Sequence, residues 1–522
     1  MQSWVKQEVI RFLRSNYGYY RSLMVVLLEW NERTKYRSSE EIVMVDLSNL
    51  KRGPIMIALI VGMFVAALNE TLMGNALPAL MNSFDATATK VQWLTTAYLL
   101  VVGVLVPVTA VLQQWFTTRQ MFLTAMSLFF AGTLISAVSP VFGVLLAGRV
   151  IQAIGTGMLL PLIMNIIMTI YPPEKRGGAM GMLGLVVMFA PAIGPTLSGL
   201  IVDGLSWRWL FYLVVPFALL SIIIGAAVLK NVSEVTKPRV DILSIILSTV
   251  GFGGIVYGFS SAGERGWSEP LVIWMIAAGG VSLALFIWRQ LLLKEPVMDL
   301  RAFRYPVFAL VAVLMFVLLM TFFSSAIMLP MFMQGVLMMT AFKSGLVLLP
   351  GGILNGLMAP VSGKLFDKFG LRVLVIPGLT LAIVSLWLFT RFGETTETGF
   401  LIAAHLTLMV GIALVMMPVQ TAGLNQLPSQ LHPHGTAILN TLQQVSGAIG
   451  IALYISIMSN GQKQYLSNVS EPVSPLEITK GLAAGINNAF WFGVIVACVA
   501  LLLGLFLPKG KGIAPERERE VS

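Results

Sequence analysis

The sequence predicts an all-α membrane protein that crosses the bilayer many times. Of its 522 residues, 57% are hydrophobic and 11% are charged, whereas soluble domains contain about 25% charged residues. Apolar stretches of about 20 residues, the length that a helix needs to cross the hydrocarbon core, recur from Pro54 to Pro508. The segments between them are too short to hold a large soluble domain.

Fourteen such stretches can be counted, with boundaries that hydropathy places to within a few residues. Each of them is expected to form one transmembrane helix. In chain order, the expected spans are 55–80, 91–112, 120–139, 142–170, 178–202, 207–229, 241–262, 270–292, 306–334, 344–362, 372–390, 399–423, 436–459 and 485–507.

The basic residues predict the orientation of these spans. With both ends inside, the cytoplasmic segments after residue 50 carry 19 Lys and Arg, and the external ones carry 7. Because cytoplasmic loops are enriched in basic residues, both termini are expected in the cytoplasm. The net charge of +10 does not predict nucleic-acid binding, because the basic residues are scattered in short loops and form no stripe.

The first 43 residues are expected to be an extension that lies upstream of the biological start. Glu40 and Glu41 directly precede Met44, as translation of a purine-rich ribosome-binding site would give. The alternative is an amphipathic helix that lies on the membrane surface. The single cysteine, Cys498, lies in the last apolar stretch, so a disulfide within the chain is excluded and no metal site is expected.

The chain also contains traces of an internal duplication. Gly178 and Ala192 of span five correspond to Gly435 and Ala448 of span thirteen, and Arg119 corresponds to Arg372, at offsets of 257, 256 and 253 residues. Transporters are often built from such repeats. The expected organisation is an extension (1–43), a six-helix bundle (44–229), two inserted helices with linkers (230–305), a second six-helix bundle (306–508) and a charged cytoplasmic tail (509–522).

Glu70 is the first functional candidate, because it places a carboxylate inside the first span. A charge at membrane depth costs roughly 2.5 to 3.5 kcal/mol and usually marks an ion or proton route. Arg149 lies inside span four, and at 1.5 Å per residue the two side chains come to similar depths. They predict either a proton switch, in which protonation releases Glu70 from Arg149 or from substrate, or a permanent ion pair that joins two helices.

Two further segments carry glycine and proline patterns. After span ten, Gly363, Asp367, Gly370 and Arg372 predict a cytoplasmic gate, since the aspartate can accept from helix amides or pair with a basic residue. The alternative is an ordinary charged loop. In span five, Pro191 and Pro195 predict a kink, and Gly194 and Gly199 leave a groove for a neighbouring helix. Ordinary membrane packing is the alternative there.

Other polar and aromatic side chains in the spans are candidates for a substrate cavity, although many could instead form hydrogen bonds between helices. His405 is a possible proton relay or a structural histidine. The cavity candidates are Asn75, Trp93, Tyr98, Asn165, Asn355, Asn440, Gln443 and Gln444.

Several of these sequence segments resemble motifs of the major facilitator superfamily. The loop 363–372 is similar to its loop signature, and 190–199 to the antiporter signature of its drug exporters, with Ala190 and Ser198 where that pattern prefers glycine. Segments 69–78, 92–100 and 207–216 resemble the fourteen-helix drug:proton antiporter branch, in particular the lincomycin-resistance exporters of Gram-positive bacteria. The resemblance covers residues 44–508.

The resemblance implies two six-helix bundles plus two helices, and proton-driven export of lipophilic drugs from a bacterial cell through its inner (cytoplasmic) membrane. It implies that Glu70 and Arg149 couple transport to protons and that Asp367 acts in the gate. No nucleotide-binding loop and no pair of nucleophile and base occurs, so we expect neither an enzyme nor a cofactor, only a proton gradient and a monomer in the bilayer. The alternatives are a proton-coupled importer and a non-transporting sensor or scaffold.

Overall fold

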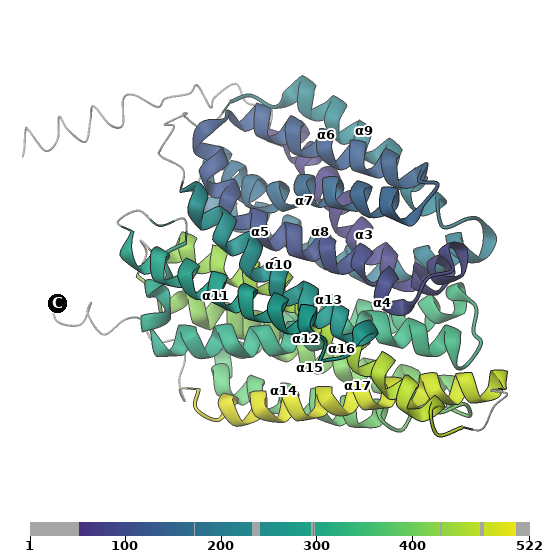
Figure 1. The fold of residues 1–522 in the computed structure, drawn as a ribbon. Coiled ribbons are helices and arrows are strands. Elements are labelled where there is room, and N and C mark those ends of the chain that lie inside the picture. Colours follow the sequence, from purple (N-terminus) through teal and green to yellow (C-terminus); the bar gives the residue numbers. More distant parts are fainter. Residues whose placement is uncertain are drawn as a thin grey trace, which may run out of the picture. The chain divides into compact units, whose positions relative to one another are not determined.

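The computed structural model describes residues 52–171, 173–231, 241–293, 296, 298–428, 431–469 and 474–507. The expected extension at 1–43, the possible start at Met44 and the tail at 509–522 lie outside the described residues. The described chain folds into helices joined by short loops (Figure 1).

The helices follow one another in this order: α3 (Arg52–Phe84), α4 (Ala88–Val91), α5 (Trp93–Trp115), α6 (Thr118–Ala137), α7 (Phe142–Ile170), α8 (Pro173–Gly204), α9 (Trp209–Val228), α10 (Ile242–Arg265), α11 (Pro270–Leu292), the 3-10 helix η2 (Leu300–Arg304), α12 (Pro306–Gly335), α13 (Ala341–Phe369), α14 (Leu371–Phe389), α15 (Thr398–Asn425), α16 (His432–Leu466) and α17 (Pro475–Gly504).

The predicted fold class is confirmed. Within the described ranges, thirteen segments are long and apolar enough to cross a membrane, and α8, with 32 residues, is the further long helix at the position of span five. The observed helix ends differ most from the ends of the expected spans at α17, which begins ten residues before the expected span 485–507. Ser474 caps this helix by accepting from the Glu477 amide, and Pro475 follows at its first turn. Hydropathy marks only the apolar part of such a helix.

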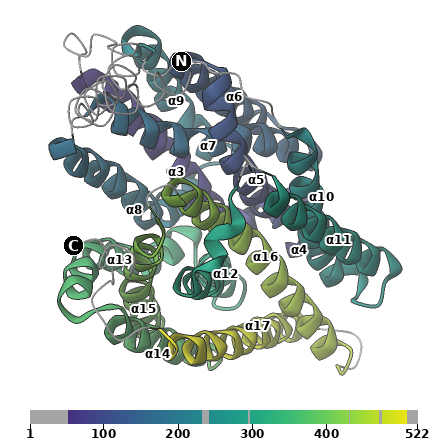
Figure 2. The same ribbon diagram turned by 90° about the vertical axis from the view of Figure 1, so that its left-hand side faces the viewer.

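The long helices pack in two groups (Figure 2). In one group, α7 packs on α5, α6 and α8, α9 packs on α6, and α3 joins α9, where Ser221 Oγ donates to the Ala58 carbonyl. In the other, α12 packs on α15, α16 and α17, α13 packs on α15, and α14 contacts α15 and α17. The two groups meet along two seams, α8 against α13 and α5 against α16, and α3 also contacts α12.

The inserted helices α10 and α11 form a hairpin beside the α5–α16 seam. Helix α10 packs on α16 and also on α5, where the Gln92 amide donates to Ser260 Oγ over 2.7 Å. The rings of Trp93 and Tyr257 lie next to each other, with centroids 5.7 Å apart. The outer helix α11 exposes large apolar side chains, as lipid contact favours. The hairpin therefore covers one seam between the groups.

An ion pair closes the other end of this hairpin. Asp241 caps α10 and pairs with Arg289 of α11 at 2.9 Å. Burial disfavours the charged carboxylate, but hydrogen bonds from Arg289 and Ser244 outweigh it and hold the pKa of Asp241 below its usual value. The two inserted helices are thus fixed to each other by charge as well as by packing.

Candidate functional site

The candidate site begins in the middle of α3, at Asn69 and Glu70. Asn69 is buried, whereas Glu70 is only partly buried. Successive residues of a helix point about 100° apart, so the two side chains leave α3 in different directions. The asparagine enters the packed interior, and Glu70 is the less buried of the two residues.

Arg149 of α7 is fully buried and is held by uncharged groups. Its guanidinium donates to the Asn69 and Gln152 side-chain oxygens, the latter over 2.7 Å, and its Nε donates to the Leu94 carbonyl over 3.3 Å. Its Nη2 has no hydrogen-bond partner. Since a buried cation is costly unless it is hydrogen-bonded, these neutral acceptors explain how the charge is kept at membrane depth.

The aromatic ring of Tyr98 completes the cradle for Arg149. The guanidinium carbon lies 4.1 Å from the ring centroid, within the range of a cation–π interaction. The Tyr98 hydroxyl is itself hydrogen-bonded to Thr156 Oγ1 over 2.7 Å, and Gln152 donates to Thr133 over 2.7 Å. The cradle thus joins α3, α5, α6 and α7.

Glu70 does not form an ion pair with Arg149. In the described ranges, the pairs within 4.0 Å are Asp241–Arg289, Asp299–Arg301 and Glu477–Lys480. The two charges still interact electrostatically, but Asn69, and not Glu70, is the direct partner of Arg149 from α3. A permanent ion pair between the first and fourth spans, one of the two alternatives from the sequence, is therefore not what this structure contains.

Transport is the activity that the sequence resemblance implies, and replacing Arg149 by Lys is expected to lower it at least about tenfold, because a lysine ammonium keeps the charge but cannot reproduce the planar guanidinium or its stacking on Tyr98. The measurement is transport at matched expression, together with the thermal stability of purified protein. Arg208→Lys is the matched control, since Arg208 also stacks on an aromatic ring, that of Trp207, but lies at a helix end. Equal transport by both variants would contradict the role of the cradle.

The small residues of span five, which is α8 in the structure, lie in very close contact with neighbouring helices. A Cβ atom on Gly194 would be 2.2 Å from Thr71 Oγ1 of α3, and one on Gly199 would be 2.2 Å from the Ala341 carbonyl oxygen of α13. Pro195 contributes its carbonyl, 2.5 Å from where a Cβ on Gly345 would lie. The side chain of Pro191 lies outside the described part. The segment thus presses α8 against both α3 and α13.

The expected cytoplasmic gate lies where α13 turns into α14. Gly370 joins these helices as a single residue with φ +83°, a conformation that favours glycine. Gly363 lies in the last turns of α13, Arg372 is half-buried in the first turn of α14, and the side chain of Asp367 lies outside the described part. The gate stays a prediction.

The eight cavity candidates lie in different parts of the structure and have different contacts. Tyr98 belongs to the Arg149 cradle and Trp93 to the hairpin contact. Asn75 is fully buried between helices. Asn165 bonds to Gln113 of α5, and Asn355 bonds to the Met409 carbonyl of α15.

The last three candidates, Asn440, Gln443 and Gln444, are half-buried on α16. The Gln444 Cβ lies 3.1 Å from where a Cβ on Gly103 of α5 would be, and its Oε1 has no hydrogen-bond partner. His405 is buried in α15 next to Gly351 of α13, with its Nδ1 unpartnered. A substrate-cavity role for these three residues of α16 stays a prediction.

Asn69 and Gln152 are the site residues that the sequence reasoning missed. Both are neutral, so charge did not single them out. The spacing of Arg149 and Gln152, three residues apart in one helix, and the position of Asn69 beside Glu70 were the available signals.

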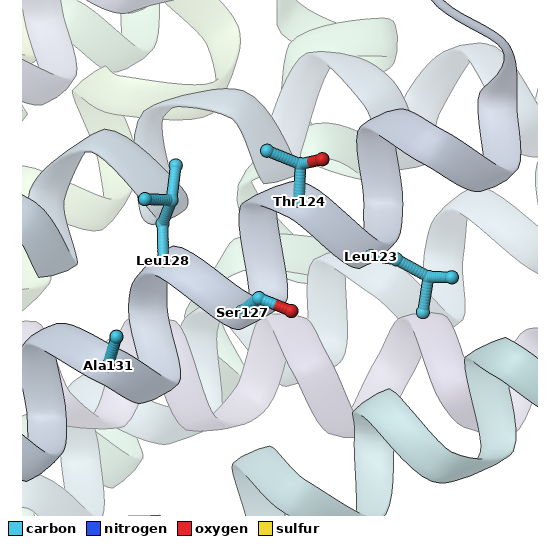
Figure 3. A pocket seen from close by; sticks show the side chains of 5 residues that line it. All are labelled: Leu123, Thr124, Ser127, Leu128 and Ala131. Atoms are coloured by element: carbon cyan, nitrogen blue, oxygen red, sulfur yellow. The ribbon is translucent and has the colours of Figure 1, made fainter.

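A shallow hollow also lies on the outer face of α6, away from these residues (Figure 3). Leu123, Thr124, Ser127, Leu128 and Ala131 line it, all from one helix. It contains no titratable side chain, and an apolar helix face of this kind suits lipid. We do not assign a transport role to it.

Comparison with protein families gives a match over residues 59–451 to the family described as Major Facilitator Superfamily. The chain is 53% identical over 458 residues to "Lincomycin resistance protein LmrB" of Listeria monocytogenes serovar 1/2a, covering 88% of this chain and 97% of that protein. It is 53% identical over 460 residues to the protein of the same name from Bacillus subtilis, covering 88% and 96%.

More distant relatives extend the comparison. "Multidrug export protein EmrB" of Haemophilus influenzae is 25% identical over 425 residues, covering 81% of this chain and 83% of that protein. Among solved structures, a D-xylose-proton symporter superposes with a TM-score of 0.63 at 16% identity, covering 88% of this chain and 99% of that one. A peptide transporter POT gives 0.63 at 15% identity, covering 87% and 96%. These two structures support the fold alone.

Proposed function

This chain belongs to the major facilitator superfamily, and we propose that it exports lipophilic drugs, lincosamides among them, in exchange for protons. The names of its relatives support an efflux transporter of this superfamily. Proton coupling, a position in the bacterial cytoplasmic membrane with both termini in the cytoplasm, and a monomeric state are our proposals beyond that.

The observation that carries the proton coupling is the free carboxylate of Glu70. Glu70 is only partly buried as a residue, its carboxylate has no ion-pair partner within 4.0 Å in the described chain, and it interacts electrostatically with Arg149, a cation that neutral groups hold in place. A carboxylate without a permanent partner can gain and lose a proton in each cycle, whereas a locked ion pair would resist protonation.

The proposed cycle has two steps at this site. In the outward-facing state, Glu70 takes a proton from outside, which removes its attraction for substrate and releases the drug. In the inward-facing state it loses the proton to the cytoplasm and becomes able to bind the next drug molecule. Arg149 stays charged and anchored throughout by its neutral hydrogen-bond acceptors.

The test is uptake into inverted membrane vesicles, whose interior corresponds to the cell exterior. Lincomycin and a fluorescent cationic dye should both accumulate when respiration acidifies the lumen, and an uncoupler should abolish the accumulation. Absence of gradient-dependent uptake of either compound would contradict the proposal.

The same vesicles separate the two rival functions. A proton-coupled importer would move its substrate out of the inverted lumen, along with protons, and a sensor or scaffold would give no flux in either direction. The direction of flux is therefore the deciding observation.

A further inference from the structure

Asn75 joins the two helix groups through a complete set of hydrogen bonds. Its Nδ2 donates to the carbonyls of Pro195 in α8 and Ala341 in α13, both over 2.8 Å. Its Oδ1 accepts from Gln334 Nε2 of α12 over 2.9 Å and from Ser344 Oγ of α13 over 2.8 Å. A primary amide can form four hydrogen bonds, and this buried one forms all of them, across four helices.

Asp203 forms a second connection between the same groups. It lies in the last turn of α8, and its two carboxylate oxygens accept from the backbone amides of Ala341 and Phe342 over 2.9 and 2.7 Å. The next amide of α13, that of Lys343, is accepted by Thr340 Oγ1. Helix N-termini leave such amides unpaired and favour a negative charge, so a residue from one group completes the cap of a helix in the other.

The backbones between these two connections touch without intervening side chains. Gly199 lies against the Ala341 carbonyl and Gly345 against that of Pro195. Thr196 Oγ1 also donates to the Gly345 carbonyl over 2.9 Å. Contact this close means that α8 and α13 cannot separate here without breaking the polar bonds together.

All of these contacts lie on one side of the molecule. They involve the last turns of α8 and α12 and the first turns of α13, which are the ends opposite to the start of α3 and the end of α17. With both termini in the cytoplasm, this is the external side. Figure 2 shows α8 and α13 side by side where the two groups meet.

We propose that Asn75 and Asp203 form an external lock that holds the transporter closed toward the outside and must open once in every transport cycle. The proposal deepens the proposed function and rests on it for its orientation. Asn75, a cavity candidate from the sequence, thus acts in gating and does not contact the substrate. Each bond is a neutral or charge-assisted hydrogen bond that water can replace once the helices part, so the lock is reversible.

The experiment measures access to a reporter cysteine behind the lock. In a Cys498→Ser background, Thr71→Cys places a thiol on α3 one turn from Asn75. Thr71 donates only to carbonyls of its own helix, so its replacement leaves the lock bonds in place. A membrane-impermeant thiol reagent is applied to intact cells and to inverted vesicles, and the labelling rate is compared.

Asn75→Ala removes all four hydrogen bonds of the amide, and Asp203→Asn removes one of the two that the carboxylate accepts. Each variant should raise labelling from the outside by roughly tenfold or more, since losing about one to two hydrogen bonds of this kind already has that effect, and should not raise labelling from the inside. Asn487→Ala is the matched control, because its amide donates to the Phe392 carbonyl within one helix group. An unchanged outside rate in both lock variants, with the proteins folded, would overturn the proposal.

The outcomes of the lock and of the proposed function can be distinguished. Labelling requires no drug and no proton gradient, so faster labelling in a protein that moves no drug would support the lock and contradict the export function. Normal export with an unchanged labelling rate in the lock variants would support the export function and contradict the lock. As a second measurement, a disulfide between cysteines at positions 203 and 342 should stop transport, and a reductant should restore it.

Discussion

Glu70→Gln is expected to abolish gradient-driven drug accumulation, lowering it at least about tenfold, while the protein still folds; the neutral amide also lacks the charge that attracts substrate in the proposed cycle. The amide has the size of the carboxylate but cannot exchange a proton, so the coupling step is lost without a change in packing. Uptake of lincomycin into inverted vesicles at matched expression measures the effect.

Glu397→Gln is the control for this prediction. Glu397 is exposed at the start of α15, so its substitution removes the same charge outside the membrane core. If Glu70→Gln retained gradient-driven uptake at the level of the control, protons would have to enter through another group, and the assignment of Glu70 would be wrong.

Gly199→Val is expected to abolish transport, because the new side chain has no room at the α8–α13 contact. Its Cβ would lie 2.2 Å from the Ala341 carbonyl oxygen and 2.6 Å from the Phe342 Cα atom. These are backbone atoms, so relief requires one whole helix to move. We expect the external side to stay partly open, which drug efflux and labelling of Thr71→Cys can both measure.

Gly204→Val is the matched control in the same helix, since a Cβ at Gly204 has no atom within 4 Å. It should transport normally. Normal transport by Gly199→Val as well would indicate that α8 and α13 need not approach this closely during the cycle.

Much of the fold could be predicted from hydropathy because the bilayer imposes one solution on an apolar stretch of about 20 residues. The helix ends that extend into water, such as residues 475–484 of α17, could not, since their caps and not their hydropathy decide where they begin. Hydropathy also could not predict which helices pack against each other, because this depends on specific contacts such as that of Gly199 with Ala341.

Part of the candidate site could also be predicted from the constraints that the bilayer imposes. Glu70 and Arg149 stood out because a charge in an apolar stretch is costly. The neutral residues that hold Arg149 carried no such signal, and Asn75 could not be recognised as a lock residue, since its partners come from three other helices and two of its bonds are to backbone carbonyls.

The central claim is that drug and proton movements are coupled through Glu70. The most direct measurement uses purified protein in liposomes that contain a pH-sensitive dye and hold a proton gradient, with acid inside. Addition of lincomycin outside should accelerate the outward movement of protons in the wild type and have no effect with Glu70→Gln. Lincomycin transport by the wild type without any accompanying proton movement would contradict the account.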